Sequence, residues 1–210
     1  MTSDTGAQNA VETRRFHDEV RVDLVGDGRV ARMVMERGDT VPNVFGPSDL
    51  EAMTTAVESL EGEIDCLVLC GEPVFSAGAN LRAIDETPQE LRSAKIGAIA
   101  AASNRLIRVV RQFPAPVIAA VSGVAAGGGL SFVLSSDLIY MDEDAVLNTA
   151  YARIGLTPDN ATPFFLAKSA GPFKTRELLF DSSQSPPPRP STFGSQTGFT
   201  AVPSRSSSDE

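Results

Sequence analysis

The sequence predicts a single α/β domain, on three observations. The chain has 210 residues and is 42% hydrophobic, which suffices for one domain with a substantial core. Short, fully apolar runs such as Cys66–Cys70 are typical of strands buried in a parallel sheet. Stretches with helix start and stop signals lie between such runs, and strands that alternate with helices indicate an α/β fold.

The first predicted elements form a hairpin followed by a helix. Apolar and charged residues alternate over 20–24, which is the period of a half-buried strand. Gly26-Asp27-Gly28 predicts a turn into a second strand over 30–35. Gly46-Pro47 then opens a helix that runs to about Leu60, because proline is favoured in a first helical turn.

The next helix follows the Cys66–Cys70 strand. Thr87-Pro88-Gln89-Glu90 has the spacing of a capping box, and it predicts a helix that lasts until Phe113, before Pro114. The remaining predicted elements are a strand over 117–121, a helix over 128–135, a strand over 138–141, and helices over 161–170 and 174–181.

We expect three segments along the chain. Residues 1–18 are predicted to be a flexible leader, and residues 19–181 to be the folded core domain. Residues 182–210 are rich in Ser and Pro and show no helical or strand period. Such a segment buries too little apolar area to offset its ordering entropy, so we expect a disordered tail.

Charge and composition exclude several classes of function. With 18 basic and 27 acidic residues the net charge is −9, which argues against nucleic acid or an anionic membrane as a partner. His17 is the only histidine, so we expect no His-based catalytic triad and no metal site. Cys66 and Cys70 lack a CxxC or His partner and are interpreted as buried free thiols. The chain shows neither a membrane span nor a secretory signal, so we expect a cytoplasmic enzyme that uses carboxylates and backbone amides.

Two Gly-rich turns follow predicted strands, over residues 75–81 and 123–129. Small residues let a ligand approach the backbone, and amides at a helix N-terminus favour negative charge. Neither turn matches a dinucleotide motif or a P-loop. Each turn alone is equally well explained by tight packing of a helix on a strand. Together they can supply two convergent N–H donors, which is the geometry of an oxyanion hole.

These turns resemble two motifs of the crotonase superfamily, the family of enoyl-CoA hydratases and isomerases. Phe75–Leu81 is similar to the segment F-(S/A)-A-G-A-D-(L/I), and Pro116–Leu130 is similar to the signature with three glycines. Asp137-Leu138-Ile139 and Ile154–Asp159 fit the motifs that follow, and Arg37 fits an early region loosely. The resemblance covers roughly residues 19–181.

The resemblance implies a spiral of ββα units that binds an acyl-CoA thioester. The carbonyl of the thioester would lie between the amides of Ala79 and Gly128, which would stabilise an enolate. The family implies no cofactor beyond the coenzyme A of the substrate, and a homotrimer or a dimer of trimers. By the same resemblance, the predicted substrate-binding residues are Ala77, Gly78, Asn80, Leu81, Gly127, Ser131, Tyr151 and Arg37, of which Arg37 would meet a CoA phosphate or remain a solvated surface residue.

The chain departs from the hydratases of this family at their two glutamates. Ser131 and Tyr151 stand in those places, so ordinary hydration lacks its two acid–base groups. Asp159 follows Pro158, where isomerase-type members carry their single carboxylate. The resemblance therefore favours a double-bond shift with Asp159 as the base. For Asp159, the alternative is a structural role as a helix cap or in an Asx turn. For the protein, the alternatives are a hydratase or hydrolase activity and an inactive binding product.

The tail does not resemble the C-terminal helices of the family, which we expect to be largely missing. A shifted reading frame of Pro187–Phe193 can encode Ala-Glu-Ala-Leu, which the family carries at this point. We therefore interpret the residues from about 182–186 onward as a truncated or frameshifted reading of that region.

Overall fold

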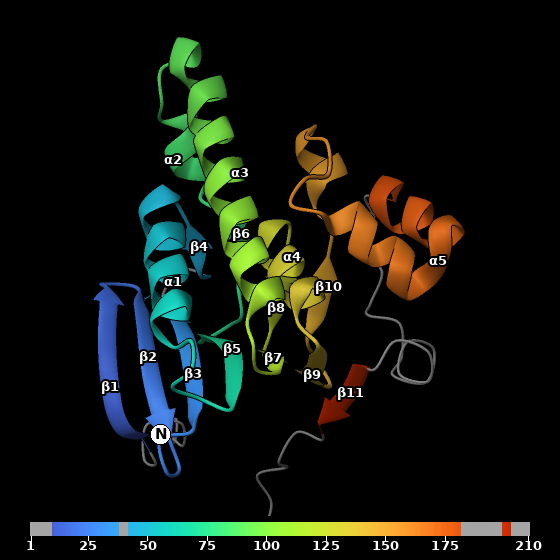
Figure 1. The fold of residues 1–210 in the computed structure, drawn as a ribbon. Coiled ribbons are helices and arrows are strands. Elements are labelled where there is room, and N and C mark those ends of the chain that lie inside the picture. Colours follow the sequence, from blue (N-terminus) through green and yellow to red (C-terminus); the bar gives the residue numbers. More distant parts are fainter. Residues whose placement is uncertain (1–9, 38–41, 182–198, 203–210) are drawn as a thin grey trace, which may run out of the picture.

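The computed structural model describes residues 10–37, 42–181 and 199–202. One large sheet runs through it in the order β1-β2-β3-β5-β7-β9-β11 (Figure 1). Its strands are β1 (Ala10–His17), β2 (Val20–Val25), β3 (Val30–Glu36), β5 (Cys66–Glu72), β7 (Val117–Val121), β9 (Leu138–Asp142) and β11 (Phe199–Val202). The β1–β2 and β2–β3 pairs are antiparallel, and the pairs from β3 onward are parallel.

Short strands form a second layer. They are β4 (Val44–Phe45), β6 (Gly78–Ala79), β8 (Val124–Ala126) and β10 (Val146–Asn148). β4 pairs with β6 and β8 pairs with β10, both in parallel, and a bridge between Ser76 and Ala125 joins the two pairs.

Each long strand from β3 to β9 is thus followed by a short strand and then by helix, which makes four ββα turns of a spiral. The helices are α1 (Pro47–Ser59), α2 (Leu81–Asp85), α3 (Gln89–Gln112), α4 (Gly128–Ser135), the 3₁₀ helix η2 (Tyr151–Ile154) and α5 (Thr162–Phe180). This arrangement confirms the predicted α/β class and the spiral of ββα units. In α5, Gly171 has non-helical dihedral angles, so this element consists of two helical pieces, as the sequence predicts.

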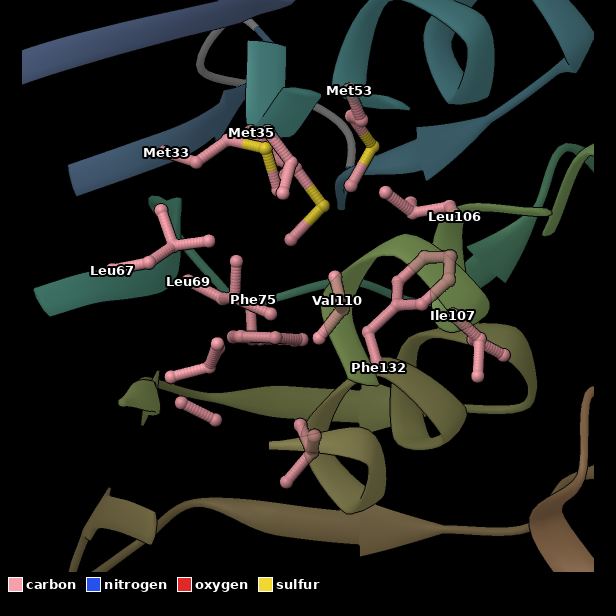
Figure 2. Packing of buried hydrophobic residues seen from close by; sticks show 14 of the residues in the cluster. Met33, Met35, Met53, Leu67, Leu69, Phe75, Leu106, Ile107, Val110 and Phe132 are labelled. Atoms are coloured by element: carbon pink, nitrogen blue, oxygen red, sulfur yellow. The ribbon is translucent and has the colours of Figure 1, made fainter. Parts of the chain in front are cut away.

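The core lies between the large sheet, the short strands and the helices. Met33 and Leu69 from the sheet, Met53 from α1 and Phe132 from α4 are each at most 1% exposed. Figure 2 shows these side chains converging with Leu106 of α3 on one continuous cluster. Since every turn of the spiral contributes apolar side chains to this cluster, packing fixes the relative position of the two Gly-rich turns.

The predicted flexible leader over residues 1–18 is wrong for residues 10–17, which form β1. Its register pairs Thr13 with Asp23 and Arg15 with Arg21, and the Thr13 hydroxyl donates to Asp23 Oδ1 at 2.9 Å. Arg14 also forms an ion pair with Glu63 at 2.8 Å. The polar character of this strand made it look like a leader, but an edge strand of an antiparallel sheet carries polar residues. Residues 1–9 lie outside the described part of the chain.

The predicted disordered tail also needs one correction. Phe199–Val202 form β11, which pairs in parallel with β9 over Ile139–Asp142. The rest of the predicted tail, residues 182–198 and 203–210, lies outside the described residues. The predicted capping box at Thr87 is wrong, because the Thr87 hydroxyl donates to Ala83 O and α3 has no side-chain cap.

The charged residues of β2 are buried, although their alternation predicts a solvent-facing side. Arg21 is 9% exposed and Asp23 is 2% exposed. Arg21 is paired with Asp23 at 3.1 Å and with Glu72 of β5 at 2.8 Å. The same strand and β5 thus supply the partners that the buried charge of Arg21 requires. Within the described residues, no helix combines the length and apolar character needed to cross a membrane.

Candidate active site

The first Gly-rich turn is held rigidly between β5 and β6. Ser76 is fully buried, and its hydroxyl donates to Asn43 O at 3.0 Å while it accepts from Gly78 N at 3.1 Å. The Ala77 amide donates to Asn43 O at 2.7 Å, and the Asn80 amide donates to Phe45 O at 3.0 Å.

The second Gly-rich turn opens α4. Gly127 has φ of +52° and its amide donates to Asn148 O at 3.0 Å, so this turn is anchored to β10. Gly128 is the first residue of α4. The first N–H groups of a helix have no intrahelical acceptor and carry the positive end of the helix dipole. The Gly128 amide is therefore available to an oxygen that gains negative charge.

The two turns lie against each other. Ser76 N donates to Val124 O and Ala126 N donates to Ser76 O, both at 2.9 Å. A Cβ atom on Gly78 would lie 3.2 Å from Gly128 N, and one on Gly129 would lie 2.5 Å from Ser76 O. Glycine is needed here because the backbones touch. This proximity supports the predicted pairing of the Ala79 and Gly128 amides.

A chain of hydrogen bonds lies beside these turns, and we call it the hydroxyl cluster. It contains Ser131 of α4, Thr162 at the start of α5, Tyr151 at the start of η2, and Asp159. Ser131 Oγ is 2.5 Å from Thr162 Oγ1, and Tyr151 Oη is 3.3 Å from the same atom. Tyr151 Oη donates to Asp159 Oδ1 at 2.9 Å. Asp159 itself is half-buried, so its carboxylate remains within reach of a ligand.

The electrostatics of the hydroxyl cluster keep Tyr151 protonated. Burial of the phenol, reinforced by the neighbouring charge of Asp159, raises the pKa of Tyr151 to about 12. At neutral pH the phenol therefore keeps its proton and donates a hydrogen bond to Asp159 Oδ1. The second carboxylate oxygen of Asp159, Oδ2, takes no part in this hydrogen bond.

Local backbone geometry positions Asp159. Asn160 and Ala161 both have positive φ, of 51° and 60°, so the chain turns sharply after Asp159 and enters α5. Thr162 N donates to Asp159 O at 3.0 Å within this turn. The N-cap of α5 is Ala161 and no side chain caps the helix. The Asp159 side chain therefore serves neither as helix cap nor in an Asx turn, and it accepts from Tyr151 instead.

Two predicted substrate contacts are corrected by their surroundings. Ser131 is fully buried and its hydroxyl is hydrogen-bonded to that of Thr162, so it cannot touch a substrate. Tyr151 is 5% exposed and its hydroxyl is bonded to Asp159, so it acts on the carboxylate rather than on a ligand. Sequence position alone placed these residues at the site, but only packing shows that their polar atoms face each other.

Asn80 and Leu81 lie at the end of the first turn, whereas Arg37 lies beside β4. Asn80 Oδ1 accepts from Ala83 N at 3.0 Å and caps α2, and Leu81 is 45% exposed as the first residue of that helix. Arg37 donates to Val44 O at 3.0 Å and pairs with Glu19 at 3.1 Å. The charge of Arg37 is thus used to hold β4, in place of the predicted contact with a CoA phosphate.

A shallow, open hollow lies beside β4 and is lined by Glu19, Glu36 and Asp49 together with Asn43 and Phe45. Three carboxylates make this hollow unsuitable for the phosphates of coenzyme A. Across the ranges described above, no group of three His, Cys, Asp or Glu residues could hold a metal ion.

Sequence reasoning missed Thr162 and Asn160. Thr162 links Ser131 to Tyr151, and a Cβ atom on Gly128 would lie 3.4 Å from Asn160 Nδ2. A threonine at the start of a helix carries no signal of such a bridge. The left-handed backbone of Asn160 has no signature either, because asparagine is common in loops of every kind.

Comparisons with known proteins identify the relatives of this chain. The family model described as enoyl-CoA hydratase/isomerase matches residues 26–188. A Bos taurus protein, enoyl-CoA hydratase domain-containing protein 2, mitochondrial, is 29% identical over 154 residues, which are 72% of this chain and 51% of that protein. The short-chain-enoyl-CoA hydratase of Clostridium acetobutylicum is 26% identical over 161 residues, with coverage of 75% and 60%. This chain thus spans less than two thirds of the length of these relatives.

A solved structure shares the fold. The crystal structure of an enoyl-CoA hydratase from Polaromonas sp. JS666 superposes with a TM-score of 0.75 at 27% identity, and the match covers 89% of this chain and 71% of that one.

Proposed function

The chain belongs to the enoyl-CoA hydratase/isomerase family, and we propose that it shifts the double bond of an enoyl-CoA thioester with Asp159 as the acid–base group. The observation that carries this proposal is the hydrogen bond of 2.9 Å from Tyr151 to Asp159. It supports the proposal because a buried donor orients the carboxylate, and the next residue, Asn160, lies close to Gly128 of the second Gly-rich turn. Because this chain spans only part of the length of its relatives, both the substrate class and the reaction belong to the proposal.

The reaction needs one carboxylate and one oxyanion hole. The thioester oxygen would accept from the Ala79 and Gly128 amides, while Asp159 takes a proton from C2 of a 3-enoyl-CoA. The C–H electron pair then forms the C1–C2 double bond of an enolate, whose oxygen carries the negative charge. Return of the same proton to C4 moves the double bond to C2–C3 and restores the thioester carbonyl. Each amide donor of such a hole is worth about 10²–10³ in rate.

Hydration is the second candidate, because the relatives and the matched structure are named as hydratases. Adding water requires one group to activate the water and one to deliver a proton. The two positions where hydratases of the family carry glutamate hold Ser131, which is fully buried, and Tyr151, which stays protonated. Asp159 alone is sufficient for a proton shift but not for both tasks of hydration.

Mass-resolved turnover of 3-enoyl-CoA and 2-enoyl-CoA separates the two candidates. We expect conversion of the 3-enoyl thioester without a gain of water, and no hydration of the 2-enoyl thioester. Asp159→Asn should lower isomerisation by about 10²–10⁴, the usual worth of a general base. Asp144→Asn is the matched control, because Asp144 is exposed and lies outside the site. Unchanged isomerisation in the Asp159 variant would remove this residue from its role.

We also propose that the protein assembles as a homotrimer or a dimer of trimers, as the family does. Exposed aromatic side chains on α5 support this, since Phe164, Phe173 and Phe180 are 58%, 81% and 78% exposed. Apolar surface of this kind usually marks an interface. Sedimentation velocity at several protein concentrations would reveal the mass of the assembly, and a monomer throughout would contradict the proposal.

A further inference from the structure

Asn160 is a buried polar side chain whose carboxamide is not hydrogen-bonded by any of the described residues. It is 5% exposed, and its Oδ1 is buried without a hydrogen-bond partner. Its Nδ2 forms no hydrogen bond with any residue of the described ranges either. Buried amide side chains normally have their polar atoms paired, so an unpaired carboxamide requires an explanation.

The backbone around this side chain is also costly. Asn160 has φ of +51° and the next residue, Ala161, has φ of +60°. Non-glycine residues seldom adopt this left-handed conformation, and two in succession are rarer still. Strained backbone of this kind concentrates at functional sites, where the surrounding structure enforces it. Here the strain brings the Asn160 side chain inward, directly after Asp159.

The carboxamide lies against the proposed oxyanion hole. A Cβ atom on Gly128 would be 3.4 Å from Asn160 Nδ2 on one side and 2.6 Å from the Phe45 ring on the other. Gly128 thus sits between an aromatic ring and an amide group. Nδ2 carries two N–H donors, and the neighbouring Gly128 amide supplies another one at the positive end of α4.

We propose that Asn160 is a third N–H donor to the substrate oxygen, beside the amides of Ala79 and Gly128. This inference rests on the proposed function, because the oxygen is the thioester oxygen that becomes negative in the enolate. A donor aimed at that oxygen binds the enolate more strongly than the neutral carbonyl, so its contribution appears in kcat more than in KM. The substrate oxygen would supply an acceptor for Nδ2, whereas Oδ1 is itself an acceptor and takes no part in this contact.

Two variants of Asn160 separate this role from a structural one. Asn160→Gly removes the carboxamide and suits the left-handed backbone, so the thermal unfolding midpoint should stay the same or rise. Asn160→Asp keeps the shape but replaces the donor by an anionic oxygen next to the hole. Both should lower kcat by about 10²–10³, with a smaller change in KM, and the aspartate variant should be the slower one. Asn104→Asp, at an exposed position of α3, controls for the added charge and should match the wild type.

An infrared measurement tests the contact without turnover. With a ¹³C label in the thioester carbonyl of bound 2-enoyl-CoA, the wild type should shift the carbonyl stretch to lower frequency than Asn160→Gly does. Equal frequencies together with equal kcat would overturn the role of Asn160, even if the wild type isomerises its substrate. If the wild type binds the thioester but catalyses nothing, the proposed function fails, while the frequency difference still decides for or against Asn160. A wild type that binds no thioester at all overturns both.

Discussion

The hydroxyl of Tyr151 donates a hydrogen bond of 2.9 Å to Oδ1 of Asp159, eight residues further along the chain. Tyr151 begins η2, whereas Asp159 lies in the loop before α5. This bond gives Oδ1 of the carboxylate one fixed partner and does not involve Oδ2. Four predictions follow from this bond, from the burial of the site and from the packing around it.

Replacing Tyr151 by Phe should weaken the proposed base without removing it. A hydrogen bond to a charged group is worth about 1.5–3 kcal/mol, so we expect kcat to fall by about tenfold or more. Tyr140→Phe is the matched control, since Tyr140 is the other tyrosine of the chain and lies exposed on β9. An unchanged kcat in Tyr151→Phe would argue against a role for the Tyr151–Asp159 contact.

Tyr151 should make the protein less stable at alkaline pH. Burial raises its pKa from 10.0 in the unfolded chain to about 12 in the folded one. Between these two values the unfolded state loses the phenol proton and the folded state keeps it, so stability falls as pH rises. The expected slope is about 1.4 kcal/mol per pH unit across that window, and none of it is present below pH 10. Urea unfolding of wild type and Tyr151→Phe at matched pH values isolates this slope, which should be missing from the variant.

The two cysteines should differ in reactivity towards an alkylating reagent. Burial raises the pKa of the Cys70 thiol to about 11, and a smaller degree of burial raises the pKa of Cys66. The thiolate is the reactive species, so Cys66 should be labelled first by iodoacetamide at mildly alkaline pH. Mapping the modified peptides by mass gives the order. In Cys66→Ser the folded protein should stay almost unlabelled until it is unfolded, and rapid labelling of Cys70 would show that β5 is less protected than the structure indicates.

The close approach of the two Gly-rich turns should make Gly129 intolerant of alanine. The added Cβ would lie 2.5 Å from Ser76 O and 2.9 Å from Ser76 Cβ, neither of which can move aside freely. We expect Gly129→Ala to lower the free energy of unfolding by about 1–3 kcal/mol. Gly97→Ala is the control, since nothing lies within 4 Å of its added Cβ in α3. That variant should be more stable than the wild type by about 0.5–1 kcal/mol, because alanine favours a helix.

Much of the fold could be predicted because it depends on local patterns. The apolar runs at Cys66–Cys70 and Val117–Val121 mark strands wherever they pack, and the helix Gly128–Ser135 begins where the glycines end. The short strands of the second layer were missed, since two or three residues are too few to show a period. β1 was missed because an edge strand with polar side chains has the composition of a leader.

The sequence by itself determined the α/β class and the two Gly-rich turns, because glycine spacing and apolar period are local properties of the chain. The ββα spiral and the family followed from the resemblance of these motifs to those of the crotonases. Only the tertiary structure decided what the side chains around Asp159 do. Ser131, Tyr151 and Thr162 come from three different elements, and their hydroxyl groups meet because α4 and α5 pack together around the same buried space. The position of Asn160 beside Gly128 has the same origin: a left-handed turn directs its side chain towards a residue 32 positions earlier in the chain. Partners of buried polar atoms are chosen by packing across the whole chain, and no short stretch of sequence contains that information.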